Sequence, residues 1–200
     1  MDLAVVALTF AAIFVVELPD KTFVAALVLS TRYRGLFVWV GVGLAFLVQV
    51  LIAVAAGKLA TYLPEDLIRG VAVAIFLLGA VVLFRSAPGA DEEEQEAEQE
   101  YAAKAAAPKQ GLRAIGASFL VLFAAEWGDL SQLLTASLAA RYDDPVSVFT
   151  GAWTALLTVS GLAVLAGRFL LRHIRLAVVH YVGVAVCLLL AGVTVYELIA

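Results

Sequence analysis

The chain has 200 residues, of which 64% are hydrophobic and 15% are charged, and its formal net charge is −4. A typical soluble domain is about 45–50% apolar and about 25% charged, and a chain of this size buries at most about 70% of its unfolded surface. The composition therefore excludes a soluble globular enzyme, a disordered chain and a disulfide scaffold. It predicts an all-α integral membrane protein, and the net acidity argues against nucleic acid as a partner.

Six apolar segments follow one another along the chain, and each is long enough, or nearly so, to cross a bilayer as a helix. The first and fourth would reach roughly 42 Å as straight helices, beyond the about 30 Å of a hydrocarbon core. Each of these two has a polar cluster near its middle, beside Pro19 or Gly128, so we expect both helices to be kinked or broken there. The segments cover residues 3–30, 36–57, 67–84, 112–140, 145–167 and 176–196.

Residues 87–110 differ from the rest of the chain. Seven acids fall within ten residues, from Asp91 to Glu100, and Ala, Gln, Pro and Lys surround them. Such a charge run is typical of a solvated segment. We therefore expect residues 87–110 to be an acidic linker between two halves, residues 1–86 and 111–200.

The two halves are related by an internal repeat. At an offset of 110, residues 41–58 match residues 151–168 at seven of eighteen positions. Three helices in each half mean that the second half enters the membrane from the opposite side, so we expect two inverted three-helix repeats. At an offset of 109, the aligned pairs are Glu17 with Glu126, Asp20 with Asp129, Thr22 with Ser131, and Arg32 with Arg141.

The basic residues of the loops predict the orientation of the helices. Nine Lys and Arg residues fall on one side of the expected membrane, and only Lys58, Arg69 and Arg141 fall on the other. The positive-inside rule assigns the first side to the cytoplasm. Both termini are then expected outside, and the acidic linker is expected in the cytoplasm.

Four acids lie deep in the apolar segments, two in each half. An ionised carboxylate there costs about 2.5–3.5 kcal/mol, so four of them indicate a function. The i, i+3 spacing within each half predicts that both carboxylates share one helix face, and inverted symmetry would bring the two faces together near the midplane. The acids are Glu17, Asp20, Glu126 and Asp129, and the neighbouring neutral oxygens are on Thr22, Ser131 and Gln132.

An oxygen-rich cluster of this kind suits hard divalent cations such as Mn²⁺ and Ca²⁺. Softer metals prefer Cys, Met or His, but the only Met is the first residue, and Cys187 stands alone in an apolar run. We interpret Cys187, His173 and His180 as structural or interfacial. The expected ligands are therefore the four acids, with the three neutral side chains completing or orienting the shell.

Lys21 is the one cation beside these acids. A buried structural ion pair with Asp20 is one interpretation, but it leaves the other three acids and the repeat unexplained. We expect Lys21 instead to be a gating or charge partner, which pairs with an acid in the empty site and releases it when the cation arrives.

The two acidic motifs resemble the paired E-x-G-D-K/R-T/S signatures of the Gdt, or transmembrane protein 165, family. They read Glu17-Leu18-Pro19-Asp20-Lys21-Thr22 and Glu126-Trp127-Gly128-Asp129-Leu130-Ser131-Gln132. The resemblance covers essentially the whole chain and implies a duplicated six-helix exchanger of manganese and calcium ions against protons. Two positions depart from the signatures: Pro19 replaces Gly, and Leu130 replaces a basic residue. The short chain is typical of a bacterial member, which implies the inner (plasma) membrane.

We expect a secondary transporter that exports Mn²⁺, with Ca²⁺ as a second candidate, in exchange for protons. Two alternatives stay open: an exporter of a small cationic organic solute such as an amino acid, for which Trp127 is the one aromatic candidate, and a non-transporting membrane scaffold. We do not expect an enzyme or a cofactor, since the sequence shows no nucleophile–base pair or cofactor motif. The expected partners are the cation, protons and the lipid bilayer, and a homo-oligomer is left open.

Overall fold

The computed structural model describes residues 1–18, 21–105, 110–173 and 176–199, and the regular elements in these ranges are all helical. This confirms the prediction of an all-α fold. The elements are α1 (Leu3–Glu17), α2 (Lys21–Arg32), α3 (Gly35–Ala60), α4 (Glu65–Ser86), a 3₁₀ turn (Ala87–Gly89), α5 (Ala90–Lys104), α6 (Leu112–Ala125), α7 (Leu130–Tyr142), α8 (Pro145–His173) and α9 (Leu176–Ile199).

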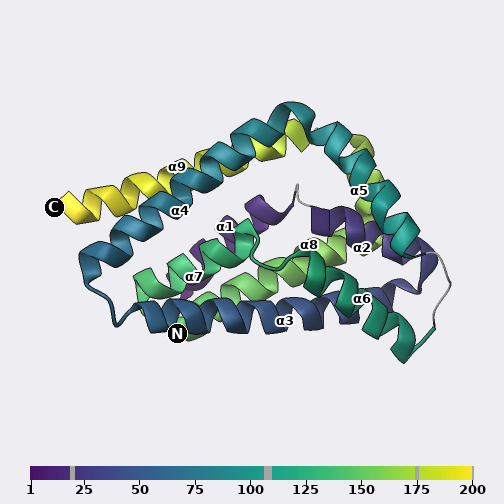
Figure 1. Ribbon diagram of the computed structural model, residues 1–200, viewed down its shortest axis with the longest axis horizontal. Coiled ribbons are helices and arrows are strands. Elements are labelled where there is room, and N and C mark those ends of the chain that lie inside the picture. The colour runs from purple at the N-terminus through teal and green to yellow at the C-terminus, as the bar shows by residue number, and fades with distance from the viewer. Residues whose placement is uncertain (19–20, 106–109, 174–175, 200) are drawn as a thin grey trace.

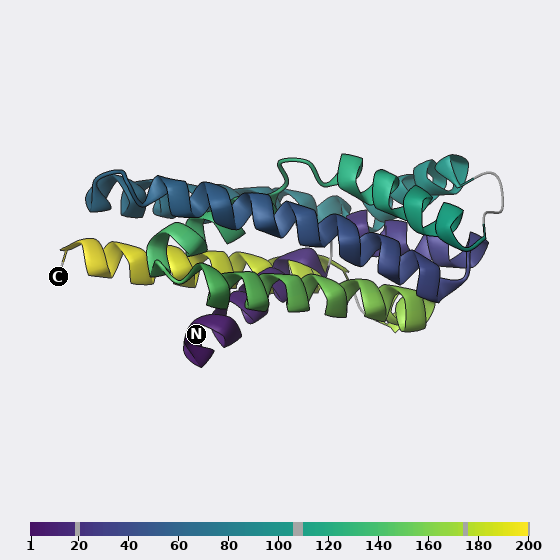
Figure 2. The ribbon, with the colours of Figure 1, turned by 90° about the horizontal axis from the view of Figure 1, so that it is seen from below.

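The helices form an elongated bundle, which Figures 1 and 2 show from two sides. Helix α4 packs along α9 on one side of the bundle, and α3 packs against α6, α7 and α8 on the other. Both chain termini and the turn from α3 to α4 lie toward the left in Figure 1, and we name this the termini end. Helix α5 and the turn from α2 to α3 lie toward the right, which we name the α5 end.

Two helix pairs are sharply bent. Helices α1 and α2 meet at 71°, and α6 and α7 meet at 75°. Among the described residues, four helices are long and apolar enough to cross a membrane, or up to six if each bent pair is one span. The bends fall at the two acidic motifs, as the sequence predicts. Because lipid cannot satisfy the backbone groups that a break exposes, these breaks must be covered by protein or water.

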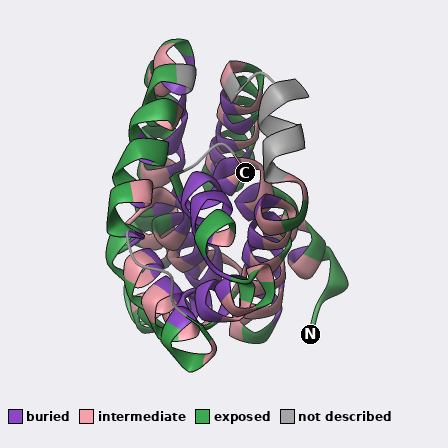
Figure 3. Cartoon of the chain, turned by 90° about the vertical axis from the view of Figure 1, so that its right-hand side faces the viewer, coloured by how far each residue is buried: buried purple, intermediate pink, exposed green. Residues whose placement is uncertain are grey.

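The pattern of burial matches a bundle surrounded by lipid. Buried residues lie on the helix faces that point inward, and exposed residues lie on the outer faces (Figure 3). The exposed residues include large apolar side chains from several of the long helices, among them Leu51, Leu78, Leu165 and Leu189. A surface in water rarely carries so much contiguous apolar area. The chain is therefore a multi-pass membrane protein.

Two glycines allow neighbouring helices to touch through their backbones. A Cβ atom at Gly151 of α8 would lie 2.6 Å from a backbone oxygen of α1 and 2.9 Å from the Cβ of Thr9. A Cβ atom at Gly41 of α3 would lie against a backbone oxygen of α6 and 2.9 Å from the Cβ of Ser118. Small residues at such crossings permit close packing in membranes, so both contacts depend on glycine.

The expected acidic linker contains a packed helix. Helix α5 contacts α2, and its Ala97 and Tyr101 are buried, whereas most of its acids are exposed. Within α5, Lys104 donates a hydrogen bond of 2.6 Å to Glu100, and this bond lowers the pKa of Glu100. The charged face is thus solvated as expected, but a narrow apolar face fixes the segment to the bundle. Residues 106–109 lie outside the described residues.

Candidate cation site

The first acidic motif places a buried carboxylate at a helix end. Glu17 is the last residue of α1 and is fully buried. Its Oε1 accepts a hydrogen bond from the Oγ1 of Thr22, a buried residue in the first turn of α2. The bond joins the two halves of the bent pair across the break. Asp20 and Pro19 lie outside the described residues.

The second acidic motif forms a tight turn between α6 and α7. Glu126 follows the last residue of α6 and is buried. Gly128 adopts φ +78°, in the left-handed region that glycine enters without a steric cost. Asp129 then caps α7: its Oδ1 accepts from the backbone N–H of Gln132 at 2.9 Å, and its Oδ2 accepts from the Oγ of Ser131 at 2.8 Å.

Glu126 and Asp129 are positioned by this turn and not by their spacing along one helix. The i, i+3 argument treats Glu126 and Asp129 as neighbours on one helix face, but they sit at the ends of two different helices. The left-handed Gly128 lies in the turn at which the chain bends by 75° between them. The relation expected from helical spacing therefore does not hold here, and the turn positions the acids in its place.

Three carboxylates from the two motifs converge. Glu17, Glu126 and Asp129 each offer an oxygen, and these oxygens all lie within 4.8 Å of one another. Two oxygens bound to one Ca²⁺ ion at about 2.3–2.6 Å can be at most about 5 Å apart. The three groups are therefore close enough to contact one hard cation together. Glu17 and Glu126 are buried, and Asp129 is partly buried.

The helix ends add partial charges to this cluster. The carboxyl-terminal ends of α1 and α6, which are the negative ends of their dipoles, lie at the two breaks. The amino-terminal end of α7 begins beside Asp129 and stabilises its negative charge. Broken helices that combine both kinds of end are the usual way to hold an ion inside a membrane protein.

Gln49 of α3 is a site residue that the sequence analysis did not select. Its side-chain Nε2 donates to the backbone oxygen of Phe123 at 3.3 Å, and its backbone oxygen accepts from the Nε2 of Gln132 at 3.4 Å. The Oε1 of Gln132 in turn accepts from the backbone N–H of Gly128 at 2.9 Å. The two amides brace the turn against α3. A single strongly polar side chain in the apolar run 36–57 was the available signal.

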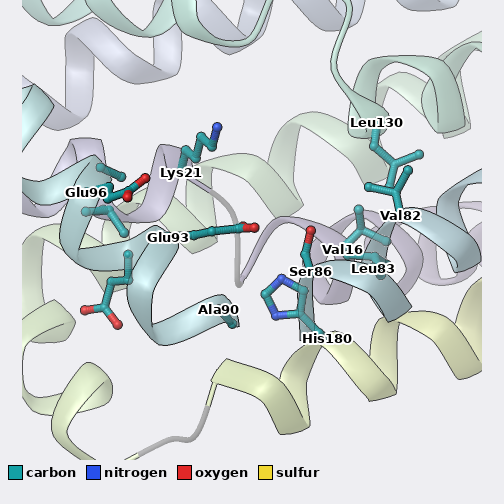
Figure 4. A pocket seen from close by; sticks show the side chains of 13 residues that line it. Val16, Lys21, Val82, Leu83, Ser86, Ala90, Glu93, Glu96, Leu130 and His180 are labelled. Atoms are coloured by element: carbon teal, nitrogen blue, oxygen red, sulfur yellow. The ribbon is translucent and has the colours of Figure 1, made fainter. Parts of the chain in front are cut away.

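Lys21 lines a cavity of about 460 Å³ between α1, α2, α4, α5, α7 and α9. Figure 4 shows its side chain among the residues that line this cavity, with Glu93 and Glu96 of α5, Ser86 of α4 and His180 of α9. The side chain of Lys21 is exposed. Lys21 thus lines the same cavity as acids of α5.

The cysteine and the two histidines are the remaining residues that the sequence analysis considered. Cys187 is a free, fully buried thiol, in keeping with a structural role. His180 is buried at the wall of the cavity. The side chain of His173 lies outside the described part of the structure.

The fold and these contacts define a class: a multi-pass helical membrane protein in which two broken helices carry carboxylates into an apolar bundle. Within that class, the chain belongs to the GDT1 family of divalent cation/proton antiporters. The family model described as "Divalent cation/proton antiporter GDT1" matches residues 5–91 and 114–200. The resemblance of the two signatures is thereby confirmed. The family consists of transporters and not of enzymes, as expected.

Individual relatives agree with this assignment. The chain is 34% identical to the chloroplast protein PAM71 of Arabidopsis thaliana over 95% of its own length, and 33% identical to a GDT1-like protein of Synechocystis over 94%. It is 27% identical to a Vibrio cholerae protein named "Putative manganese exporter", over 97%. The chain spans 95% of the Synechocystis relative and 92% of the Vibrio relative. It spans only 56%, less than two thirds, of the chloroplast protein from Arabidopsis. No solved structure matches the chain.

Proposed function

We propose that this protein exports Mn²⁺, with Ca²⁺ as a second candidate, from the cytoplasm in exchange for protons. The observation that carries the proposal is the convergence of Glu17, Glu126 and Asp129 at two helix breaks inside an apolar bundle. Family membership supports the class of transport, and the name of the Vibrio relative supports manganese. Asp20 completes the proposed set of four carboxylate ligands.

The ligand chemistry favours a hard divalent cation. Carboxylates, hydroxyls and amides are the oxygen donors that Mn²⁺ and Ca²⁺ accept. Thr22 and Ser131 already donate to Glu17 and Asp129, so they orient the carboxylates and leave other oxygen lone pairs for the ion. Gln132 is the third neutral group of the proposed shell.

The same carboxylates explain why protons can be the counter-ion. Several carboxylates within 4.8 Å repel one another strongly unless a cation or protons neutralise them. A bound divalent cation and bound protons therefore compete for the same oxygens. Protonation releases the metal on one side of the membrane, and metal binding releases protons on the other.

Packing equivalences support two inverted repeats as the frame for alternating access. Gly151 packs on Thr9, and Gly41 packs on Ser118. In the sequence, Thr9 and Ser118 are 109 residues apart and the two glycines are 110 apart, which are the offsets of the repeat. Within the described residues, the hydroxyls of both Thr9 and Ser118 are buried without a hydrogen-bond partner. The contact of α1 with α8 is thus repeated by that of α6 with α3.

The same frame supports an orientation with both termini outside the inner membrane. Lys58, Arg69 and Arg141 belong to helix ends at the termini end, and the basic positions of the other set include Arg32 and Lys104 toward the α5 end. The positive-inside rule then assigns the α5 end to the cytoplasm. In this orientation export runs from the α5 end to the termini end.

Flux measurements in liposomes test the proposal. We expect purified protein to move Mn²⁺ only when an opposing pH gradient is present, and Glu126→Gln to abolish the flux. Asp66→Asn is the matched control, since Asp66 is an exposed acid at the start of α4. Equal flux in Glu126→Gln and Asp66→Asn would refute the site.

The same liposome assay distinguishes the two alternative functions from cation export. Flux of a labelled cationic amino acid without Mn²⁺ flux would support the organic-solute exporter. Trp127, its aromatic candidate, is 61% exposed and packs on Phe123, with ring centroids 5.2 Å apart. No flux of either cation, with correctly folded protein, would support the scaffold.

A further inference from the structure

Polar contacts between helices gather at the termini end of the bundle. Lys58 at the end of α3 forms an ion pair with Asp143, just after α7. Arg69 near the start of α4 donates to the backbone oxygen of Glu197 at 3.0 Å. Both of these contacts are exposed, and exposed ion pairs contribute little stability. The third contact, from Arg141, is different because the Arg141 side chain is buried, although its partner Glu197 is partly exposed.

Arg141 joins the last turn of α7 to α9. Its Nη1 donates to the Oγ1 of Thr194 at 2.6 Å, and its Nη2 donates to the Oε1 of Glu197 at 3.0 Å. The Arg141 side chain is only 4% exposed, and its guanidinium lies 5.0 Å from the ring centroid of Tyr142. We refer to Arg141, Thr194 and Glu197 as the latch.

The latch is incompletely satisfied. Among the described residues, the Nε of Arg141 is buried without a hydrogen-bond partner. A buried guanidinium needs its donors paired to offset the loss of water. When α7 and α9 separate, water can hydrate the guanidinium of Arg141. This hydration offsets part of the cost of breaking the latch, so the latch can open.

Helix α7 connects the latch to the proposed site. Asp129 caps its first turn and Arg141 lies in its last turn, roughly 18 Å away at about 1.5 Å per residue. A helix of this length moves as a rigid body. Any tilt that shifts Asp129 relative to Glu17 and Glu126 must also shift Arg141 relative to α9.

The α5 end has the opposite character. The cavity of about 460 Å³ reaches from α5 to Lys21 and Leu130, the residues that follow Asp20 and Asp129 (Figure 4). Arg32, which the repeat aligns with Arg141, is exposed at this end. One end thus has a cavity beside the acidic motifs, and at the other end the buried side chain of Arg141 joins α7 to α9.

We propose that the latch is the gate of the termini end, and that Arg141 must leave Thr194 and Glu197 before a cation can pass outward. The inference rests on the proposed function. Arg141 is a positioning residue: it acts on the cation through α7 and does not touch it.

Cysteine labelling of the purified full chain in detergent tests the gate. Cys187→Ala removes the only cysteine, and Ser137→Cys places a reporter on a buried position of α7 that lines a small cavity near the latch. We expect Glu197→Gln and Thr194→Val each to speed labelling by a water-soluble maleimide about tenfold, the effect of losing a hydrogen bond to a charged group. Glu100→Gln is the control, since it removes an exposed pair within α5.

A second reporter separates gating from general loosening of the fold. Ala45→Cys lies buried in the middle of α3. Faster labelling at Ser137→Cys alone supports the latch, whereas an equal increase at both positions overturns it. Unchanged labelling of Ser137→Cys in both latch variants also overturns it. Because labelling needs no transport, Mn²⁺ flux of the wild-type protein, measured in parallel, tests the proposed function independently.

Discussion

The contact of α8 with α1 at Gly151 gives a stability prediction that also tests the repeat. Gly151→Ala would place a methyl group 2.6 Å from a backbone oxygen of α1, 2.9 Å from the Cβ of Thr9 and 3.1 Å from the backbone nitrogen of Phe10. No rotamer change can move these atoms. Overpacking of this kind costs about 1–3 kcal/mol, and the helix propensity of Ala offsets about 0.5–1 kcal/mol. We expect a net loss of about 1–2 kcal/mol.

Unfolding in detergent, followed by circular dichroism, measures this loss. The matched controls are Gly116→Ala in α6 and Gly192→Ala in α9, where an added Cβ meets nothing within 4 Å. They should be neutral or stabilised by up to about 1 kcal/mol. Gly41→Ala should lose as much as Gly151→Ala, since it meets the equivalent atoms of α6. Stability of Gly151→Ala equal to that of the controls would refute the packing, and a harmless Gly41→Ala would refute the equivalence.

Two further predictions concern Gln49 beside the proposed site and Asp144, which accepts hydrogen bonds from Ser147 in the first turn of α8. Gln49→Leu should weaken the apparent Mn²⁺ affinity in the flux assay by up to about tenfold, because it removes the hydrogen bond that holds α6, and with it Glu126, against α3; unchanged affinity would contradict this. Hydrogen bonds from Ser147 lower the pKa of Asp144, so this carboxylate stabilises the fold above its ordinary pKa and loses the effect as the pH falls through the lowered value. Ser147→Ala should therefore be less stable than wild type at pH 6, with the difference shrinking in acid, and a pH-independent difference would contradict this.

The sequence was sufficient to predict the features that depend on local composition. Apolar run length predicted the long helices, and the position of the acids within the overlong runs predicted both breaks. It also singled out Glu17, Glu126 and Asp129, which lie within 4.8 Å of one another. Carboxylates are costly in lipid, so their presence in an apolar run is informative without any knowledge of the fold.

Features that depend on contacts between distant segments could not be predicted in this way. The sequence placed Arg141 with the sparse basic residues of one loop side, but its burial depends on Thr194 and Glu197, more than fifty residues further along. Gln49 gave a polar signal without a partner, because the backbone oxygen that it contacts belongs to α6. Helix α5 contains so many acids that its overall composition is strongly polar. Its narrow apolar face, with Ala97 and Tyr101, could therefore not be recognised from composition.

Charge repulsion gives the proposed exchange its order. Three carboxylates within 4.8 Å repel strongly in a medium of low dielectric constant, so the cluster is stable only when a divalent cation or protons neutralise it. Asp129 is fixed to the start of α7, and the empty, ionised cluster therefore pushes α7 away from Glu17 and Glu126. A loaded cluster lets α7 approach them. Because the other end of α7 carries Arg141, we expect neutralisation of the cluster to change the position of α7 and with it the strength of the proposed latch.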